Sequence, residues 1–323
     1  MRYLMAYMNK KNLTLKDIAA LSGVGKSTVS LVINKSPRVK TATRERVEAV
    51  IREYGYTPSL TARALRAQRE KIIGIIMTRL DSAAENRAIR AILAEAYQAG
   101  YDAILQESML DPRRLEEHLH VLESRRVEGV ILFGFSGMDD VDLTPWQHRL
   151  VLIARQRPGF ASVTYDDSGA VDLLMARLHA SGRRNVSFIG VDEQDHTTGR
   201  ARYQAYLAGC KRYGFSGAAR LGDLSYQSGF MLAETLLDQE SEALICATDT
   251  LALGALKSIQ ARGLQVDVSS IGSTPLLAFL HPEVTSVRLG FAKAGLRALH
   301  MLLDMQHDKA AGGQLVLPCS LED

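Results

Sequence analysis

The 323-residue sequence is poor in cysteine and has no long apolar run. Its three cysteines, Cys210, Cys246 and Cys319, are far apart and odd in number. We therefore expect a reducing, cytoplasmic protein with neither a disulfide framework nor a zinc site. No stretch approaches the roughly 18 apolar residues of a membrane-spanning helix, so we expect no membrane partner. The first ten residues are too mixed in character for a secretory signal.

Familiar catalytic signatures are absent as well. The sequence lacks a phosphate-loop lysine motif, Gly-x-Ser-x-Gly, His-Glu-x-x-His and a dinucleotide fingerprint. An acid/base or metal cluster could be imagined around His196, Asp192 and Asp195, but the spacing matches no known ligand set, and we expect a polar surface loop. The pair Asp166-Asp167 more readily caps the next helix than performs chemistry. The sequence thus predicts no enzyme, no metal and no cofactor.

What the sequence does contain is an uneven distribution of charge. Residues 1–71 hold 15 Lys and Arg against 5 Asp and Glu, whereas the remaining residues hold 24 against 31. A small basic segment on a larger acidic body suggests a polyanion-binding module joined to another domain. A solvated charged surface is the alternative interpretation of the charge alone.

Three short helices are expected in the basic segment. Thr14 and Asp17 have the spacing of a capping box, and Gly23 stands where a tight turn needs a positive φ. A second helix is expected over 26–34 and a third over 43–54, which together fit a helix-turn-helix. The apolar residues expected to form the core of helices two and three are Val29, Val32, Ile33, Val47, Val50, Ile51 and Tyr54.

The acidic body alternates apolar runs with amphipathic stretches. This alternation predicts parallel sheets covered by helices on both faces, and so an α/β fold of one large or two smaller doubly wound domains. The expected strands are 72–77, 101–105, 130–133, 150–153, 186–190, 243–247 and 268–272. The expected helices are 84–98, 112–124, 168–180, 199–213, 226–238, 250–261 and 292–306.

An ordered set of motifs runs through the basic segment: Leu15-Lys16-Asp17-Ile18-Ala19, Ser22-Gly23-Val24-Gly25-Lys26-Ser27-Thr28-Val29-Ser30, Asn34, Thr43-Arg44-Glu45-Arg46-Val47 and Gly55-Tyr56-Thr57-Pro58. This set, with the stretch 58–66 that follows, resembles the headpiece and hinge helix of the lactose-repressor (LacI/GalR) family. The resemblance implies that the helix beginning at Lys26 enters the major groove of double-stranded operator DNA. The residues it assigns to DNA are Lys26, Ser27, Thr28, Ser30, Ala62 and Leu65.

Two positions refine this assignment. Leu65 matches the leucine that the family slides between the central base pairs, although ordinary packing of a linker helix is the alternative. Position 31 is leucine where the family often has an arginine that grips guanine. The usual bidentate base contact is therefore missing, and the operator sequence does not follow from the resemblance.

A second set of motifs runs through the body: Thr78-Arg79-Leu80-Asp81-Ser82, Leu132-Phe133-Gly134-Phe135, Gly159-Phe160-Ala161-Ser162-Val163-Thr164-Tyr165-Asp166-Asp167, Thr197-Thr198-Gly199, Cys246-Ala247-Thr248-Asp249-Thr250-Leu251-Ala252-Leu253-Gly254 and Ser273-Thr274-Pro275-Leu276. It resembles the trehalose-responsive branch of the family. The resemblance implies a periplasmic-binding-protein-like core of two subdomains, with trehalose 6-phosphate in the cleft and trehalose as a possible competitor. The effector contacts it implies are Arg79, Asp81, Ser82, Glu85, Gly134, Asp195, Thr197, Thr198, Arg202, Thr250 and Phe291. Phe291 replaces a tyrosine of that branch, so one hydroxyl contact is missing.

The residue types argue separately for a phosphorylated ligand. Arg79 directly follows an expected strand, and ligands of such folds bind at the carboxyl ends of strands. Together with Arg202 it could form forked hydrogen bonds to a phosphate. Many relatives that bind neutral sugars have aspartates after the residue matching Gly272, where this chain has Ser273-Thr274-Pro275. Each arginine could instead be an ordinary solvated charge.

These observations predict an N-terminal helix-turn-helix headpiece over residues 1–57, a hinge over 58–70 and an effector-binding core over 71–323. Residues 1–7 extend beyond the family's usual N-terminal arm. A homodimer is expected because two hinge helices share one minor groove, and the lack of a leucine heptad tail gives no basis for a tetramer. The predicted function is repression of trehalose genes, released by the sugar phosphate. The alternatives are a regulator that answers to another phosphorylated sugar, a sugar-binding transport protein and a small sugar enzyme.

Overall fold

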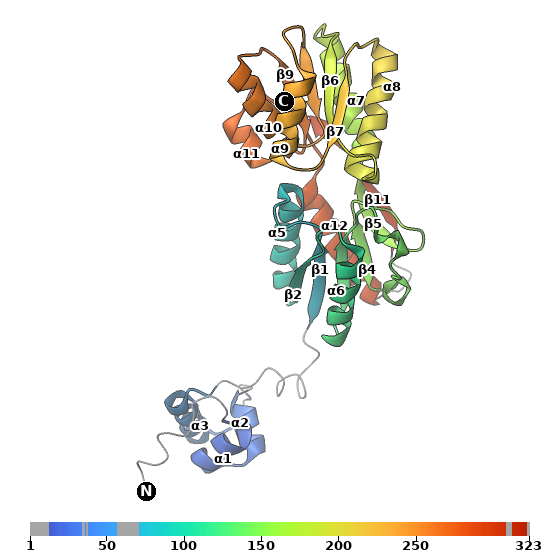
Figure 1. Cartoon of the computed structure of the whole chain (residues 1–323). Coiled ribbons are helices and arrows are strands. Elements are labelled where there is room, and N and C mark those ends of the chain that lie inside the picture. The colour runs from blue at the N-terminus through green and yellow to red at the C-terminus, as the bar shows by residue number, and fades with distance from the viewer. Residues whose placement is uncertain (1–12, 34–35, 37, 57–70, 308–311, 322–323) are drawn as a thin grey trace. The chain divides into compact units, whose positions relative to one another are not determined.

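The computed structural model describes residues 13–33, 36, 38–56, 71–307 and 312–321. The chain divides into two compact units, residues 1–70 and residues 71–323 (Figure 1). Each unit has its own hydrophobic core. No helix in the described ranges is long and apolar enough to cross a membrane.

The first unit contains three helices, α1 (Leu15–Ser22), α2 (Lys26–Ile33) and α3 (Thr41–Tyr54). Helix α1 begins as predicted, because the Asp17 carboxylate accepts hydrogen bonds from the Thr14 backbone N–H at 2.8 Å and from its hydroxyl at 2.6 Å. It ends at Gly23, whose φ of 66° is a left-handed conformation that glycine adopts without a Cβ clash. The short turn to α2 produces the expected helix-turn-helix.

The core of this unit differs from the prediction at one residue. Tyr54 was expected inside, but its side chain is 40% exposed, and Tyr56 is buried instead. Gly55 ends α3 with a φ of 60°, so the chain turns back and brings Tyr56 onto the core. The fully buried residues of this core are Ile18, Ala19, Val29, Val32, Val47 and Tyr56.

The second unit has two lobes, each built on a six-stranded sheet. The first sheet is entirely parallel, in the order β11-β5-β4-β3-β1-β2. Helices α5 and α12 pack on one face of it and α6 on the other. Its elements are β1 (Ile72–Met77), α5 (Ala83–Gln98), β2 (Asp102–Glu107), α6 (Pro112–Ser124), β3 (Gly129–Phe133), two 3-10 turns (Met138–Asp140 and Thr144–Trp146), β4 (Leu150–Ile153), β5 (Ala161–Tyr165), α12 (Phe291–His307) and β11 (Gln314–Leu317).

The second sheet has the order β12-β10-β9-β8-β6-β7, and only β12 runs antiparallel to its neighbour. Cys246, on its central strand β8, is fully buried as predicted. The elements of this lobe are α7 (Asp167–Ala180), β6 (Val186–Val191), a π-helical turn (His196–Ala201), α8 (Arg202–Tyr213), β7 (Ala219–Gly222), α9 (Tyr226–Leu236), β8 (Ala243–Cys246), α10 (Asp249–Arg262), β9 (Asp267–Ile271), α11 (Pro275–Leu280), β10 (Thr285–Arg288) and β12 (Ser320–Leu321).

The chain passes between the lobes three times, after β5, after β10 and after β11 (Figure 1). Two parallel-sheet lobes joined by three crossings confirm the predicted fold class, a helical headpiece followed by a periplasmic-binding-protein-like core. The carboxyl ends of strands from both sheets lie toward the boundary between the lobes. Loops that follow those strands therefore line a cleft, as expected for such sheets.

Candidate functional site

A cleft between the two lobes collects most of the predicted effector residues. The first lobe contributes the loops after β1, β3 and β4, and the second contributes those after β6, β7, β8 and β9. The predicted residues that line it are Arg79, Ser82, Glu85, Gly134, Asp195, Thr198, Arg202, Thr250 and Phe291. Residues from sequence motifs that are far apart in the chain therefore line one cleft, and their contacts with an effector stay a prediction.

Among the predicted effector residues whose side chains the structure describes, only Asp81 does not line the cleft. Asp81 is exposed, and its carboxylate pairs with Arg79 Nε at 3.0 Å. The side chain of Thr197 lies outside the described residues, so its contact stays a prediction. Gly134 lines the cleft, but packing within the first lobe already requires glycine at this position. A Cβ there would meet the Cβ of Arg155 at 2.5 Å.

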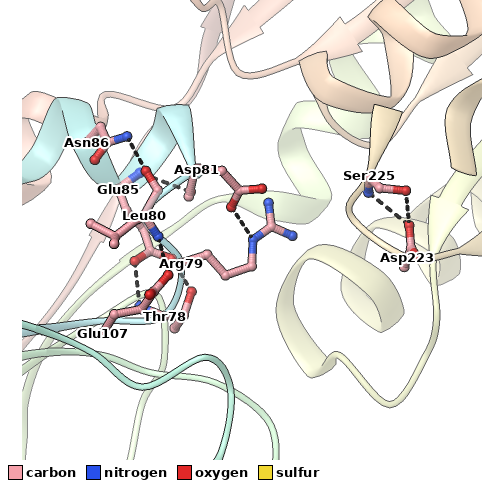
Figure 2. Close-up of polar contacts among 10 residues, drawn as sticks. Thr78, Arg79, Leu80, Asp81, Glu85, Asn86, Glu107, Asp223 and Ser225 are labelled. Atoms are coloured by element: carbon pink, nitrogen blue, oxygen red, sulfur yellow. Dashed lines mark hydrogen bonds and ion pairs between the residues drawn. The ribbon is translucent and has the colours of Figure 1, made fainter. Parts of the chain in front are cut away.

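The loop that carries Arg79 is held rigidly by its own lobe (Figure 2). Glu107 accepts a hydrogen bond from the Leu80 N–H at 2.7 Å, and Asn86 donates one to the Leu80 carbonyl at 2.9 Å. Glu85 accepts from the backbone N–H of Thr78 at 2.7 Å and from its hydroxyl. The Arg79 side chain is therefore presented to the cleft from a fixed base, with 23% of it exposed.

Burial raises the pKa of Glu85, although hydrogen bonds from Thr78 and the nearby charge of Arg79 act in the opposite direction. The carboxyl group of Glu85 therefore faces the cleft from a poorly hydrated position. Such a group suits a hydrogen bond to a sugar hydroxyl, because it accepts when ionised and donates when protonated.

Arg202, at the start of α8, lines the cleft, and its guanidinium is already engaged in an ion pair and hydrogen bonds. Its guanidinium pairs with Asp167 at 2.6 Å and donates to the carbonyl of Ala247, and only 5% of the side chain is exposed. From the sequence we expected Asp167 only to cap the next helix, and its pairing with Arg202 was not predicted. Asp166 alone caps α7, accepting from the Gly169 N–H at 2.9 Å. The positive charge of Arg202 is thus largely balanced within the second lobe.

Arg155 and Tyr165 are two residues near the cleft that the sequence reasoning missed. Arg155 pairs with Asp139 at 2.5 Å and reaches the His196 ring at 3.4 Å, so it touches both lobes. Tyr165 packs edge-on against Phe291, with ring centroids 5.3 Å apart. Burial raises the pKa of Tyr165, so its phenol stays neutral and supplies a hydroxyl where Phe291 has none. Arg155 follows β4 and Tyr165 ends β5, and a position at the carboxyl end of a strand is the feature that could have identified both as cleft residues.

A buried carboxylate organises the second-lobe wall of the cleft. Asp249 accepts hydrogen bonds from the hydroxyls of Ser270 and Ser286 at 2.6 and 2.9 Å and from the Thr274 N–H at 2.6 Å. These contacts join the ends of β8, β9 and β10 into one framework. Thr250 and Thr274, which both line the cleft, are held by it.

In the helical unit, α2 separates its buried and exposed residues as the motif predicts. Val29 and Val32 are buried, whereas Lys26 and Ser27 are exposed. Thr28 and Ser30 are partly exposed, and Leu31 is 38% exposed on the outer side. DNA contacts of these residues stay predictions. Ala62 and Leu65 of the expected hinge lie outside the described residues.

Comparison with known proteins identifies the class of molecule. Residues 14–59 match the model of bacterial regulatory proteins of the lacI family, and residues 175–323 match the periplasmic binding protein-like domain. The HTH-type transcriptional regulator TreR of Salmonella typhimurium is 46% identical over 313 residues, which are 97% of this chain and 99% of that protein.

Two solved structures show the same relationship. The trehalose repressor from Escherichia coli is similar with a TM-score of 0.76 and 44% identity, covering 78% of this chain and all of that one. The lac repressor dimer bound to operator and the anti-inducer ONPF is similar with a TM-score of 0.79 and 25% identity, covering 97% of this chain and 98% of that one.

A helix-turn-helix unit and a two-lobed core with a polar cleft are the parts of a ligand-responsive transcription regulator. The chain belongs to the lacI family of bacterial regulatory proteins. It is a TreR-like transcriptional regulator and not an enzyme, as the sequence predicted.

Proposed function

We propose that this chain represses genes for trehalose uptake or metabolism and leaves its operator when trehalose 6-phosphate binds the cleft. The observation that carries the proposal is the position of Arg79 and Arg202, which line one cleft from opposite lobes. The likeness to the trehalose repressor supports the choice of sugar. A ligand that contacts residues of both lobes favours one arrangement of the lobes, which is the basis of induction.

Arg79 is the stronger candidate for the phosphate. It is the more exposed of the two arginines, and only its Nε is used by Asp81. A phosphate can accept from its two amino groups without displacing Asp81. Arg202 already has a carboxylate partner, so its contribution is to order the cleft wall around Asp167 and Ala247.

We infer that residues 1–57 form the DNA-binding headpiece, 58–70 the hinge and 71–323 the effector core, and that the protein acts on DNA in the cytoplasm as a dimer. Helices α5 and α11 lie on the same side of the core in Figure 1, and the exposed apolar side chains that they carry support the dimer. Tyr97 is 79% and Phe279 83% exposed. We expect Phe279→Asp to sediment as a monomer and to lose operator affinity; a stable dimer would place the interface elsewhere.

The effector assignment is tested by operator release. Full-length protein selects its operator from a random-sequence DNA library, and fluorescence anisotropy then follows the complex during titration with each sugar. Trehalose 6-phosphate should release the DNA, trehalose should compete with it without releasing the DNA, and glucose 6-phosphate should have little effect. Equal release by glucose 6-phosphate would show that a different phosphorylated sugar is the effector.

A further inference from the structure

The amino groups of Arg79 point across the cleft toward a carboxylate of the other lobe. Figure 2 shows the guanidinium leaving the β1 loop, with Nε on Asp81 and its free end directed at the loop of Asp223 and Ser225. Leu224, which stands between those two residues, lines the same cleft as Arg79. The two loops therefore face each other at the site proposed above for the phosphate.

Asp223 is fixed in this position by its own loop. Its Oδ1 accepts from the Ser225 N–H at 2.9 Å and from the Ser225 hydroxyl at 2.5 Å. These hydrogen bonds, helped by the charge of Arg79, hold the pKa of Asp223 below its usual value. The residue is exposed and ionised at neutral pH, so it contributes a full negative charge at the edge of the cleft.

We propose that Asp223 is a specificity-determining residue that weakens the binding of anionic ligands by facing Arg79 across the cleft. The inference rests on the proposed function, because it concerns the phosphate of the same ligand. A phosphate that approaches Arg79 must compete with Asp223 for the guanidinium and is repelled by its charge. An uncharged sugar in the same cleft meets neither effect.

The substitution Asp223→Asn tests this directly. The asparagine side-chain oxygen still accepts from Ser225, so the loop is retained while the charge is removed. Asp238→Asn is a matched control in the same lobe. Asp238 Oδ1 also accepts from a backbone N–H and a hydroxyl, those of Glu240 and Ser241, at 3.0 Å each. It precedes the amino end of β8, whereas the cleft residues follow the carboxyl end of that strand.

Calorimetric titration of the full-length protein with trehalose 6-phosphate and with trehalose gives the readout. For Asp223→Asn we expect roughly three- to tenfold tighter binding of the phosphate at low salt, shrinking as salt screens the charges. Trehalose affinity should be unchanged, and Asp238→Asn should behave as the wild type with both sugars.

Three other results would overturn the proposal. Equal changes for both sugars would mean that Asp223 only shapes the loop. Wild-type affinity of Asp223→Asn for trehalose 6-phosphate would mean that its charge does not act on the ligand. If the wild-type protein binds neither sugar, the proposed effector fails and this inference fails with it.

Discussion

Arg87 of the first lobe donates a hydrogen bond from Nη1 to the carbonyl oxygen of Ser273 in the second lobe, at 2.6 Å. Ser273 has a φ of 51°, uncommon for a residue with a side chain, and its N–H donates to the Ser286 hydroxyl at 2.8 Å. Ser286 in turn donates to Asp249, which holds Thr274 at the cleft. A side chain on α5 is thus connected to the second-lobe wall of the binding site.

The first prediction concerns this connection. Arg87→Leu should weaken trehalose 6-phosphate binding by about tenfold, because a hydrogen bond from a charged donor is worth about 1.5 kcal/mol or more and here holds both lobes at the ligand. The sugar concentration for operator release should rise by the same factor. Arg90→Leu, an exposed position on the same helix, is the control. Unchanged release by the Arg87 variant would mean that the contact does not couple the lobes.

Arg202 leads to a prediction about stability. Arg202→Met should lower the free energy of unfolding by about 3–5 kcal/mol, because Asp167, whose side chain is only 12% exposed, would lose its charged partner. The double variant Arg202→Met/Asp167→Leu should recover most of that loss. Urea unfolding followed by circular dichroism measures both. If the single variant is as stable as the wild type, the pair is not the buried interaction described above.

Leu31 allows a test of operator reading. An exposed leucine beside Ser27 and Ser30 suits contact with a thymine methyl group, whereas arginine at the same place would grip guanine. Leu31→Arg should shift the preferred operator toward guanine at one position per half-site, by roughly 1–3 kcal/mol of discrimination. Selection from a random library measures the preference. An unchanged consensus would place Leu31 away from the bases.

The raised pKa of Glu85 predicts that the stability of the protein depends on pH. Burial raises its pKa in the folded protein, so the folded state binds its proton more tightly than the unfolded state does. The contribution of Glu85 to stability is therefore present below its unfolded pKa and lost as pH rises through the folded value. The difference in unfolding free energy between wild type and Glu85→Gln should favour the wild type most at about pH 4 and less at pH 7. A difference that grows with pH would contradict the assigned shift.

Much of the fold was predictable because its strands are short apolar runs with helical patterns between them. The expected strands at 72–77 and 150–153 and the expected helix at 112–124 have the observed bounds. The strands that were missed are β5, β7, β10, β11 and β12, each of which has five residues or fewer. β7 (Ala219–Gly222) is a half-exposed edge strand of the second sheet, and β11 (Gln314–Leu317) is a half-exposed edge strand of the first sheet outside any expected segment.

The motifs indicated which single residues belong to the cleft, but they did not indicate which other residues those side chains contact. The partners of those residues come from remote segments, and no local pattern encodes them. Asp167 and Arg202 are 35 positions apart within the second lobe, and Arg87 and Ser273 are 186 positions apart on different lobes, so neither pair lies within one local pattern. Among the arginines at the cleft, the sequence identified Arg79 and Arg202 but not Arg155. It did not predict that Asp81, Asp139 and Asp167 pair with these arginines.

Operator release by wild type and Arg79→Gln tests the central claim most directly. The claim is that the phosphate of trehalose 6-phosphate is bound by Arg79 at the end of β1. We expect both proteins to bind the selected operator equally without sugar, and the variant to need about tenfold more trehalose 6-phosphate for half release. Identical titration midpoints for the two proteins would contradict the account.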